Sequence, residues 1–200
     1  MVQEHSVGVS GLRRNIVGRH AVAPIGAWVR GSVESLAPLL VFEGETMKES
    51  IVFMIAFALV FYTTGASFIE GFVNYSSWHL IGPAEFQAFH KFITPRVLAL
   101  LVVPAALGTV FSILMLWFRP ASIPIWSVWL VIALQMVLWI SSVMIQIPIQ
   151  LKLQTQGLSI PLVDRLIVTN WWLRRLPYGI TAALFVWMMV TVLGKGKAAG

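Results

Sequence analysis

Four long runs of apolar residues constrain this chain more than any other feature of its sequence. They contain no charged side chain and cover residues 51–69, 97–118, 125–147 and 177–193. A helix that crosses the hydrocarbon core of a bilayer, roughly 30 Å thick, needs about 20 apolar residues. The composition agrees, because 58% of the 200 residues are hydrophobic and only 11% are charged. The sequence therefore predicts an all-α, multi-pass integral membrane protein, a four-helix transmembrane bundle.

The net charge of +6 and the absence of cysteine exclude several classes of function. The basic residues flank the apolar runs and form no single soluble face, so we expect membrane lipids, and not nucleic acid, as their partners. Without cysteine there is no disulfide, no thiolate nucleophile and no cysteine-held metal or iron–sulfur cluster. An oligomer is compatible with the sequence.

Residues 1–46 contain no apolar run long enough to span a bilayer. Three interpretations compete: an extramembrane tail, an organellar presequence, and upstream sequence included by a wrongly assigned start. The third is favoured, because Met47 and the three polar residues after it lead straight into the first apolar run, as a short cytoplasmic start does. We predict a poorly structured extension over residues 1–46 and the transmembrane domain over residues 47–200.

The connections between the four runs are unequal. Residues 70–96 and 148–176 form long connections, whereas residues 119–124 form a short one. With an even number of spans, both long connections lie at one face of the membrane, opposite the two termini. Counts of Lys and Arg near the runs do not settle the orientation, although Lys195 and Lys197 weakly favour termini inside.

Most polar side chains of the chain gather at the long-connection face. The first connection supplies Glu70, Asn74, His79, Glu85, Gln87, His90 and Arg96, and the second helix pair supplies Gln146, Gln150, Asp164, Asn170, Arg174 and Tyr178. His90, Gln146 and Asn170 lie at the ends of three different spans, so we expect them at similar depth. A buried amide or imidazole without a partner costs about 1–3 kcal/mol, which favours their meeting inside the bundle.

Residues 84–93 have the pattern of a short helix that lies flat at the interface. Phe86, Phe89 and Ile93 fall on one side, and Pro83 suits the first turn. Gln87 and His90 are three residues apart and therefore neighbours. The helix is either an interfacial element with a solvated polar top or the carrier of a functional His90 at the mouth of a pocket.

The segment from Gln146 to Gln150 places Pro148 at the end of an apolar run, between two amide side chains. Amides are costly in lipid, so both should face the bundle. They either link helices to one another or hold a substrate.

A metal site is one possibility, because four side chains offer nitrogen and oxygen ligands: His79, His90, Glu70 and Glu85. Their spacing is not diagnostic, since there is no HExxH motif and no pair of histidines four residues apart. We assign no residue to a metal and leave the cofactor open. Phosphate-binding loops, serine elbows and Ser/His/Asp arrangements do not occur.

The stretch from Trp78 to Tyr178 resembles a family of small bacterial four-helix membrane proteins that are distantly similar to the anthrone oxygenases of polyketide pathways. In a Phe-x-x-Tyr-His segment, Phe89 stands in place of Tyr and Ile93 in place of a second His. In a Gln-x-Pro-x-His-x-x-Leu segment, Gln150 stands in place of His. The matching residues are Phe86, His90, Arg96, Gln146, Pro148, Leu153, Thr169, Asn170, Trp171 and Arg174, with one residue inserted in the last segment.

The resemblance implies an oxygenase-like enzyme of the bacterial inner membrane that acts on a small lipophilic aromatic compound. In this hypothesis His90 is the general base, Gln146 and Asn170 orient substrate oxygens, and Arg96 or Arg174 stabilises a developing anion. Gln150 and Trp171 complete the substrate-binding set. The alternative is a non-catalytic membrane subunit or a small-molecule binding protein.

Overall fold

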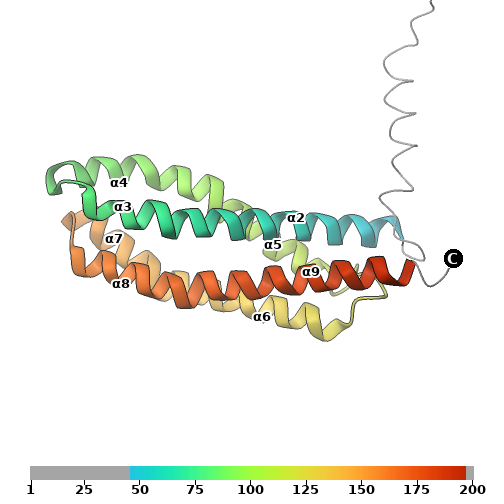
Figure 1. Ribbon diagram of the computed structural model, residues 1–200. Coiled ribbons are helices and arrows are strands. Elements are labelled where there is room, and N and C mark those ends of the chain that lie inside the picture. Colours follow the sequence, from blue (N-terminus) through green and yellow to red (C-terminus); the bar gives the residue numbers. More distant parts are fainter. Residues whose placement is uncertain (1–45, 197–200) are drawn as a thin grey trace, which may run out of the picture. The chain divides into compact units, whose positions relative to one another are not determined.

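The computed structural model describes residues 46–196 and builds them into four long helices (Figure 1). The first helix joins α2 (Met47–Ile69), η1 (Glu70–Asn74), α3 (Tyr75–Ser77) and η2 (Trp78–Leu80). The second joins α4 (Pro83–Val97), η3 (Leu98–Val102) and α5 (Val103–Leu114). The third joins α6 (Ile125–Ser141), η4 (Ser142–Gln146) and α7 (Ile147–Gln156). The fourth joins α8 (Ile160–Asn170), η5 (Trp171–Arg175) and α9 (Leu176–Gly196).

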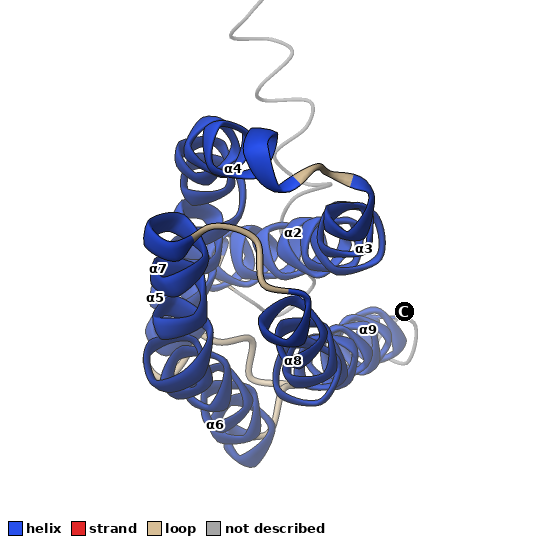
Figure 2. Cartoon of the chain, turned by 90° about the vertical axis from the view of Figure 1, so that its left-hand side faces the viewer, coloured by secondary structure: helices blue, strands red, loops and turns tan. Residues whose placement is uncertain are grey.

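The predicted all-α four-helix transmembrane bundle is confirmed. The described residues contain four helices long and apolar enough to cross a membrane and no strand. Helix α2 packs against α5 and α9, and α6 packs against the same two, so consecutive helices are neighbours around the bundle (Figure 2). Each helix therefore presents one side to the interior and leaves its opposite side to lipid.

The two long connections expected from the sequence are themselves helical, so that part of the prediction was wrong. Only residues 81–82 link the first helix to the second, and residues 157–159 link the third to the fourth. Gly157 has φ +89°, a conformation that ends α7 and that other residues rarely adopt. Pro83 opens α4 directly after Gly82, where its missing N–H is harmless.

The helices are longer than the hydrocarbon core of a bilayer is thick. Candidate spans of 32 to 35 residues are about 50 Å long at 1.5 Å per residue, against a hydrocarbon core of about 30 Å. The apolar runs lie toward the end that carries Met47 and Gly194. The opposite end, built from residues 70–96 and 148–176, is the more polar one, and we expect it to extend beyond the hydrocarbon; we call it the polar end.

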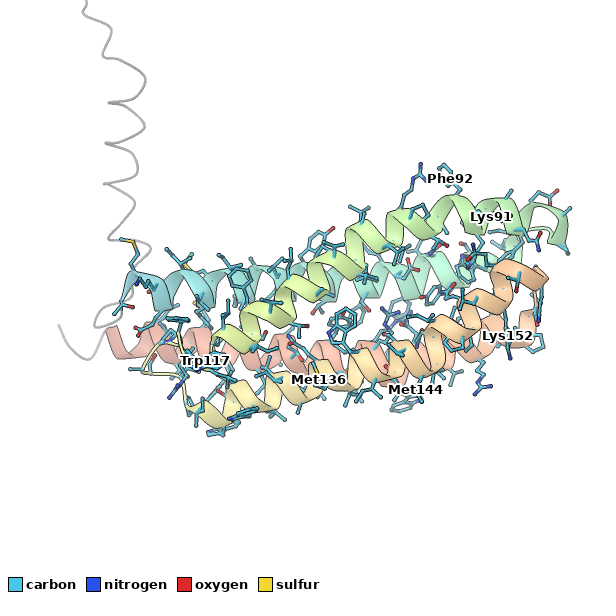
Figure 3. The ribbon with its side chains drawn as sticks, turned by 180° about the vertical axis from the view of Figure 1, so that it is seen from behind. Lys91, Phe92, Trp117, Met136, Met144 and Lys152 are labelled. Atoms are coloured by element: carbon cyan, nitrogen blue, oxygen red, sulfur yellow. The ribbon has the colours of Figure 1, made fainter. Side chains whose placement is uncertain are left out.

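The segment predicted as a separate interfacial helix, residues 84–93, lies within α4. This helix continues through η3 into α5, so the segment is the beginning of the second span. Phe86 is buried, whereas Phe92 lies on the outer side of α4 (Figure 3). The position of residues 84–93 at the membrane interface stays a prediction. The extension predicted over residues 1–46 lies outside the described residues, apart from Thr46, which caps α2 together with Glu49.

Each long helix contains one π-helical turn: η1, η3, η4 or η5. Three of these turns are followed, at the second residue, by Pro104, Pro148 or Pro177. A proline inside a helix lacks an N–H and clashes with the carbonyl four residues earlier. A π-turn carries one extra residue and so makes room there. For Pro177 that carbonyl belongs to Leu173, and it accepts a hydrogen bond of 3.3 Å from Ser141 Oγ.

Two separate clusters of buried apolar side chains hold the bundle together. One lies toward the termini and includes Phe53, Val128 and Phe185. The other lies at the polar end and includes Trp78 and Leu166. The interior between these clusters is where the candidate site is found.

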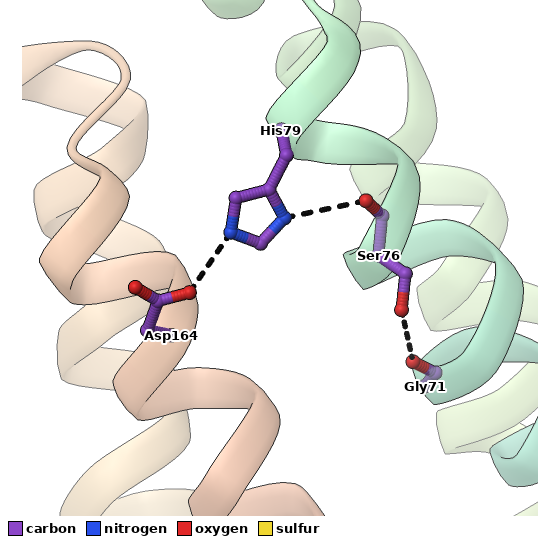
Figure 4. Close-up of polar contacts among 4 residues, drawn as sticks. All are labelled: Gly71, Ser76, His79 and Asp164. Atoms are coloured by element: carbon purple, nitrogen blue, oxygen red, sulfur yellow. Dashed lines mark hydrogen bonds and ion pairs between the residues drawn. The ribbon is translucent and has the colours of Figure 1, made fainter.

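A polar contact joins the first and fourth helices at the polar end (Figure 4). His79 Nε2 lies 2.8 Å from Asp164 Oδ1, and His79 Nδ1 lies 3.3 Å from the Ser76 carbonyl oxygen. Both His79 and Asp164 are solvent-accessible. The pair therefore links two helices at the surface and lies outside the cavity described below.

Candidate functional site

A cavity of about 340 Å³ lies between the two apolar clusters and receives side chains from all four helices. Its size falls at the lower end of the range for small-molecule sites. Most of its wall is apolar. The polar or ionisable side chains that line it are Thr63, Glu70, Tyr75, His90, Thr94, Thr109, Gln135, Ser142, Gln146, Gln150, Gln154, Arg174, Tyr178 and Thr181.

His90 belongs to a hydrogen-bonded chain in the cavity wall that continues through Gln150 to Tyr75. Its side chain is only 1% exposed, and its ring lies edge-on to Trp78 with centroids 5.4 Å apart. His90 Nε2 is 2.7 Å from Gln150 Oε1, and Gln150 Nε2 donates to the Tyr75 hydroxyl at 3.3 Å. Because a carbonyl oxygen only accepts, the neutral ring carries its proton on Nε2, and Nδ1, which lies 3.4 Å from Thr94 Oγ1, is the basic nitrogen.

Gln146 lines the same cavity but has no hydrogen-bond partner among the described residues. Neither the amide nitrogen nor the amide oxygen of this side chain has a partner, although the residue is only 3% exposed. Buried polar groups are nearly always paired, because leaving one unpaired costs about 1–3 kcal/mol. Gln146 therefore carries an unpaired donor group and an unpaired acceptor beside the cavity.

The end of the cavity nearest the termini is closed by contacts between the second and third helices. Trp139 Nε1 donates to Thr109 Oγ1 at 3.0 Å, and Gln135 Nε2 donates to Ser112 Oγ at 3.0 Å. The Gln135 oxygen has no partner among the described residues. This end is therefore mainly apolar, with a single free acceptor.

The polar end of the cavity carries the carboxyl group of Glu70 and the guanidinium of Arg174. Glu70 accepts a hydrogen bond of 2.9 Å from Asn74 Nδ2. The guanidinium of Arg174 lies close enough to Glu70, Tyr75 and Tyr178 to act on each electrostatically. Polar groups thus concentrate at one end of the cavity, while the opposite end is lined mostly by aliphatic and aromatic side chains.

The structure brings four of the seven predicted site residues together. His90, Gln146, Gln150 and Arg174 all line the cavity. Arg96, in contrast, is exposed and lies over the Phe92 ring at 3.5 Å. Trp171 is also exposed, and its ring packs edge-on against Phe72. The catalytic and binding roles assigned to these seven residues stay predictions.

Asn170 is buried but lies apart from the cavity lining, and the π-turn that follows it supplies the reason. In an α-helix, residues four apart share a face, which would place Asn170 beside Arg174. In η5 the turn is wider, and Asn170 instead sits with Arg175, five residues later, against Gly71 of the first helix. The prediction that Asn170 meets His90 and Gln146 in one cluster did not take this rotation about the helix axis into account.

Several lining residues were not predicted from the sequence. Tyr75 follows a π-turn within what looked like a connection, and Gln135 and Trp139 lie inside an apolar run. The signal for Gln135 was present, because an amide in mid-span has to find a partner inside the protein. Tyr75 had no comparable signal.

The described residues contain no group of three His, Cys, Asp or Glu side chains that could hold a metal ion. Fold and cavity together define a class: a four-helix membrane protein with an internal, polar-ended cavity of small-molecule size. Comparisons with protein-family models, with curated proteins and with solved structures find no match to the chain.

Proposed function

We propose that the protein is a membrane enzyme of the oxygenase type that acts on a small lipophilic aromatic compound held in the cavity. The observation that carries the proposal is the pairing of a buried, hydrogen-bonded His90 with an unpartnered Gln146 on the same cavity wall. One group can move a proton, and the other can orient a polar substrate. An apolar cavity with a few convergent polar groups is the usual form of such a site.

In the proposed reaction His90 Nδ1 takes the proton of a phenolic or enolic hydroxyl. Gln146 orients a substrate oxygen, and Arg174 stabilises the anion that results. Dioxygen is the oxidant in the proposed reaction: one of its oxygen atoms replaces the two hydrogens of a ring CH2 group, and the other leaves as water with those hydrogens. Gln150 and Tyr75 act on His90, because their hydrogen bonds fix which ring nitrogen carries the proton.

The resemblance to small four-helix proteins distantly similar to anthrone oxygenases supports the same cavity. Ile93 and Gln150 stand where that pattern has histidine, and both line the cavity with His90. Three positions of the pattern thus converge on one space. On the same resemblance we place the protein in a bacterial inner membrane, with lipids as its surroundings.

Turnover of anthrone-like quinol precursors under air, by the full chain in lipid nanodiscs, tests this proposal. We expect turnover above that of a heat-killed sample, and its loss in His90→Gln. His79→Gln is the matched control, because His79 is exposed and lies outside the cavity lining. Equal activity in both variants, or none in the unaltered protein, would remove the enzyme hypothesis.

Small-molecule binding without catalysis is the second candidate. Ile93 and Gln150 favour it, because neither can supply the acid–base or ligand chemistry of the histidines in the pattern. A non-catalytic binder would retain the same compounds in the cavity without converting them. Binding that is lost in Gln146→Leu, together with unchanged compounds after incubation, would establish this candidate over the first.

A further inference from the structure

The cavity is bordered by exposed apolar side chains from two neighbouring helices. Leu98 on the second helix is 51% exposed and Val143 on the third is 57% exposed, yet both line the cavity. Ile147 and Leu151 continue this edge along the third helix and are exposed as well. A side chain that is both exposed and cavity-lining marks a place where the cavity reaches the outer surface.

The two helices separate at that place because each contains a π-turn there. The main contacts between them join α5 to α6 near the termini and α4 to α7 at the polar end. Between these contacts lie η3 and η4, where π-turns bend a helix. In Figure 3 the second helix runs obliquely across the first and approaches the third near the termini, and Met144 lies on the outer side of the third helix.

The opening lies at the boundary of the hydrocarbon. Leu98 is the second residue of the apolar run that follows Arg96, and Val143 lies close to the end of the third run. His90 and Gln150 lie on the polar side of this boundary. An amphipathic molecule dissolved in the bilayer holds its polar head at the same depth, near the headgroups.

We propose that the ligand enters sideways from the bilayer between Leu98 and Val143, and that it is a lipid-soluble phenol whose alkyl chain stays in the membrane. This inference rests on the proposed function and specifies its substrate class. A cavity of about 340 Å³ holds a small ring system but has no room for a long chain. The apolar edge accommodates that chain, while the unpartnered Gln146 binds the head.

Photolabelling of the full chain in lipid vesicles tests the proposal with two probes. Both are para-dodecylphenols with a diazirine, placed beside the ring in one probe and at the chain end in the other. The ring probe is expected to label cavity residues, and the chain-end probe the outer sides of η3 and η4. In Leu98→Trp and Val143→Trp, labelling by the ring probe is expected to fall about tenfold or more, corresponding to at least 1.4 kcal/mol.

Leu100→Trp and Met144→Trp are the matched controls, because both positions are exposed on the same π-turns and neither lines the cavity. These controls should label like the unaltered protein. Cavity labelling that persists in both Leu98→Trp and Val143→Trp overturns sideways entry and leaves the binding function intact. If the chain-end probe labels all four helices evenly, the proposed position of the alkyl chain along η3 and η4 is overturned. A ring probe that never labels the cavity overturns the proposed function together with this inference.

Discussion

His90 Nε2 lies 2.7 Å from Gln150 Oε1, so a buried imidazole of the second helix depends on an amide of the third. Gln150→Ala would leave the His90 N–H buried without its partner. We expect a loss of about 1–3 kcal/mol in the free energy of unfolding. Thermal unfolding in detergent measures it, with Gln156→Ala at the exposed end of α7 as a control that should change little. Equal midpoints for the two variants would contradict the dependence.

Gly71 leaves the space into which two side chains of the fourth helix fit. A Cβ at this position would overlap the Arg175 guanidinium and the Asn170 amide. We therefore expect Gly71→Ala to destabilise the bundle by about 1–3 kcal/mol, the usual cost of overpacking.

Gly65→Ala provides the comparison within the same helix. A Cβ there meets nothing within 4 Å, so this variant should be neutral or gain up to about 1 kcal/mol from helix propensity. Chemical unfolding of both variants in the same detergent decides the matter. A Gly71→Ala protein as stable as Gly65→Ala would show that the Arg175 and Asn170 side chains can move aside.

The His79–Asp164 contact should matter little to stability. Both side chains are solvent-accessible, and exposed ion pairs contribute at most about 1 kcal/mol. We expect Asp164→Asn to shift thermal unfolding only slightly and to leave ligand binding unchanged, with a smaller effect at high salt. A loss of binding in this variant would assign the polar-end surface a role that the cavity alone does not explain.

Topology can be tested by labelling single cysteines, because the chain has none of its own. Gln156→Cys and Ala121→Cys place a thiol at opposite ends of the third helix, both at exposed positions. A membrane-impermeant maleimide applied to intact cells should label one variant, and the other only after the membrane is permeabilised. Labelling of both in intact cells would contradict the four-span arrangement.

The apolar runs predicted the number and order of the spans, but not the length of the helices. Hydropathy reports which residues sit in hydrocarbon, and a helix can continue into water beyond that boundary. Glu70 and Lys91 looked like parts of connections for this reason, although both lie within continuous helices. The true ends are set by Gly82 and Gly157, which hydropathy alone does not reveal.

For the site, α-helical spacing predicted the direction of some side chains but not of others. Gln146 and Gln150 are four residues apart and share the cavity face, as α-helical spacing requires. Asn170 and Arg174 have the same spacing, but the π-turn between them separates their directions. A single sequence gives no clear signal for such a turn, although the proline that follows three of the four is a usable indication.

The projection of the helices beyond the hydrocarbon has a consequence for the choice of membrane. Because the polar end is built of helices and very short links, the length of the bundle stays the same in bilayers of different thickness. A bilayer of longer acyl chains moves the headgroup layer toward Gln150, and one of shorter chains moves it toward Leu98. Hydrophobic mismatch would thus determine which part of a lipid faces the opening between Leu98 and Val143, without any change in the fold.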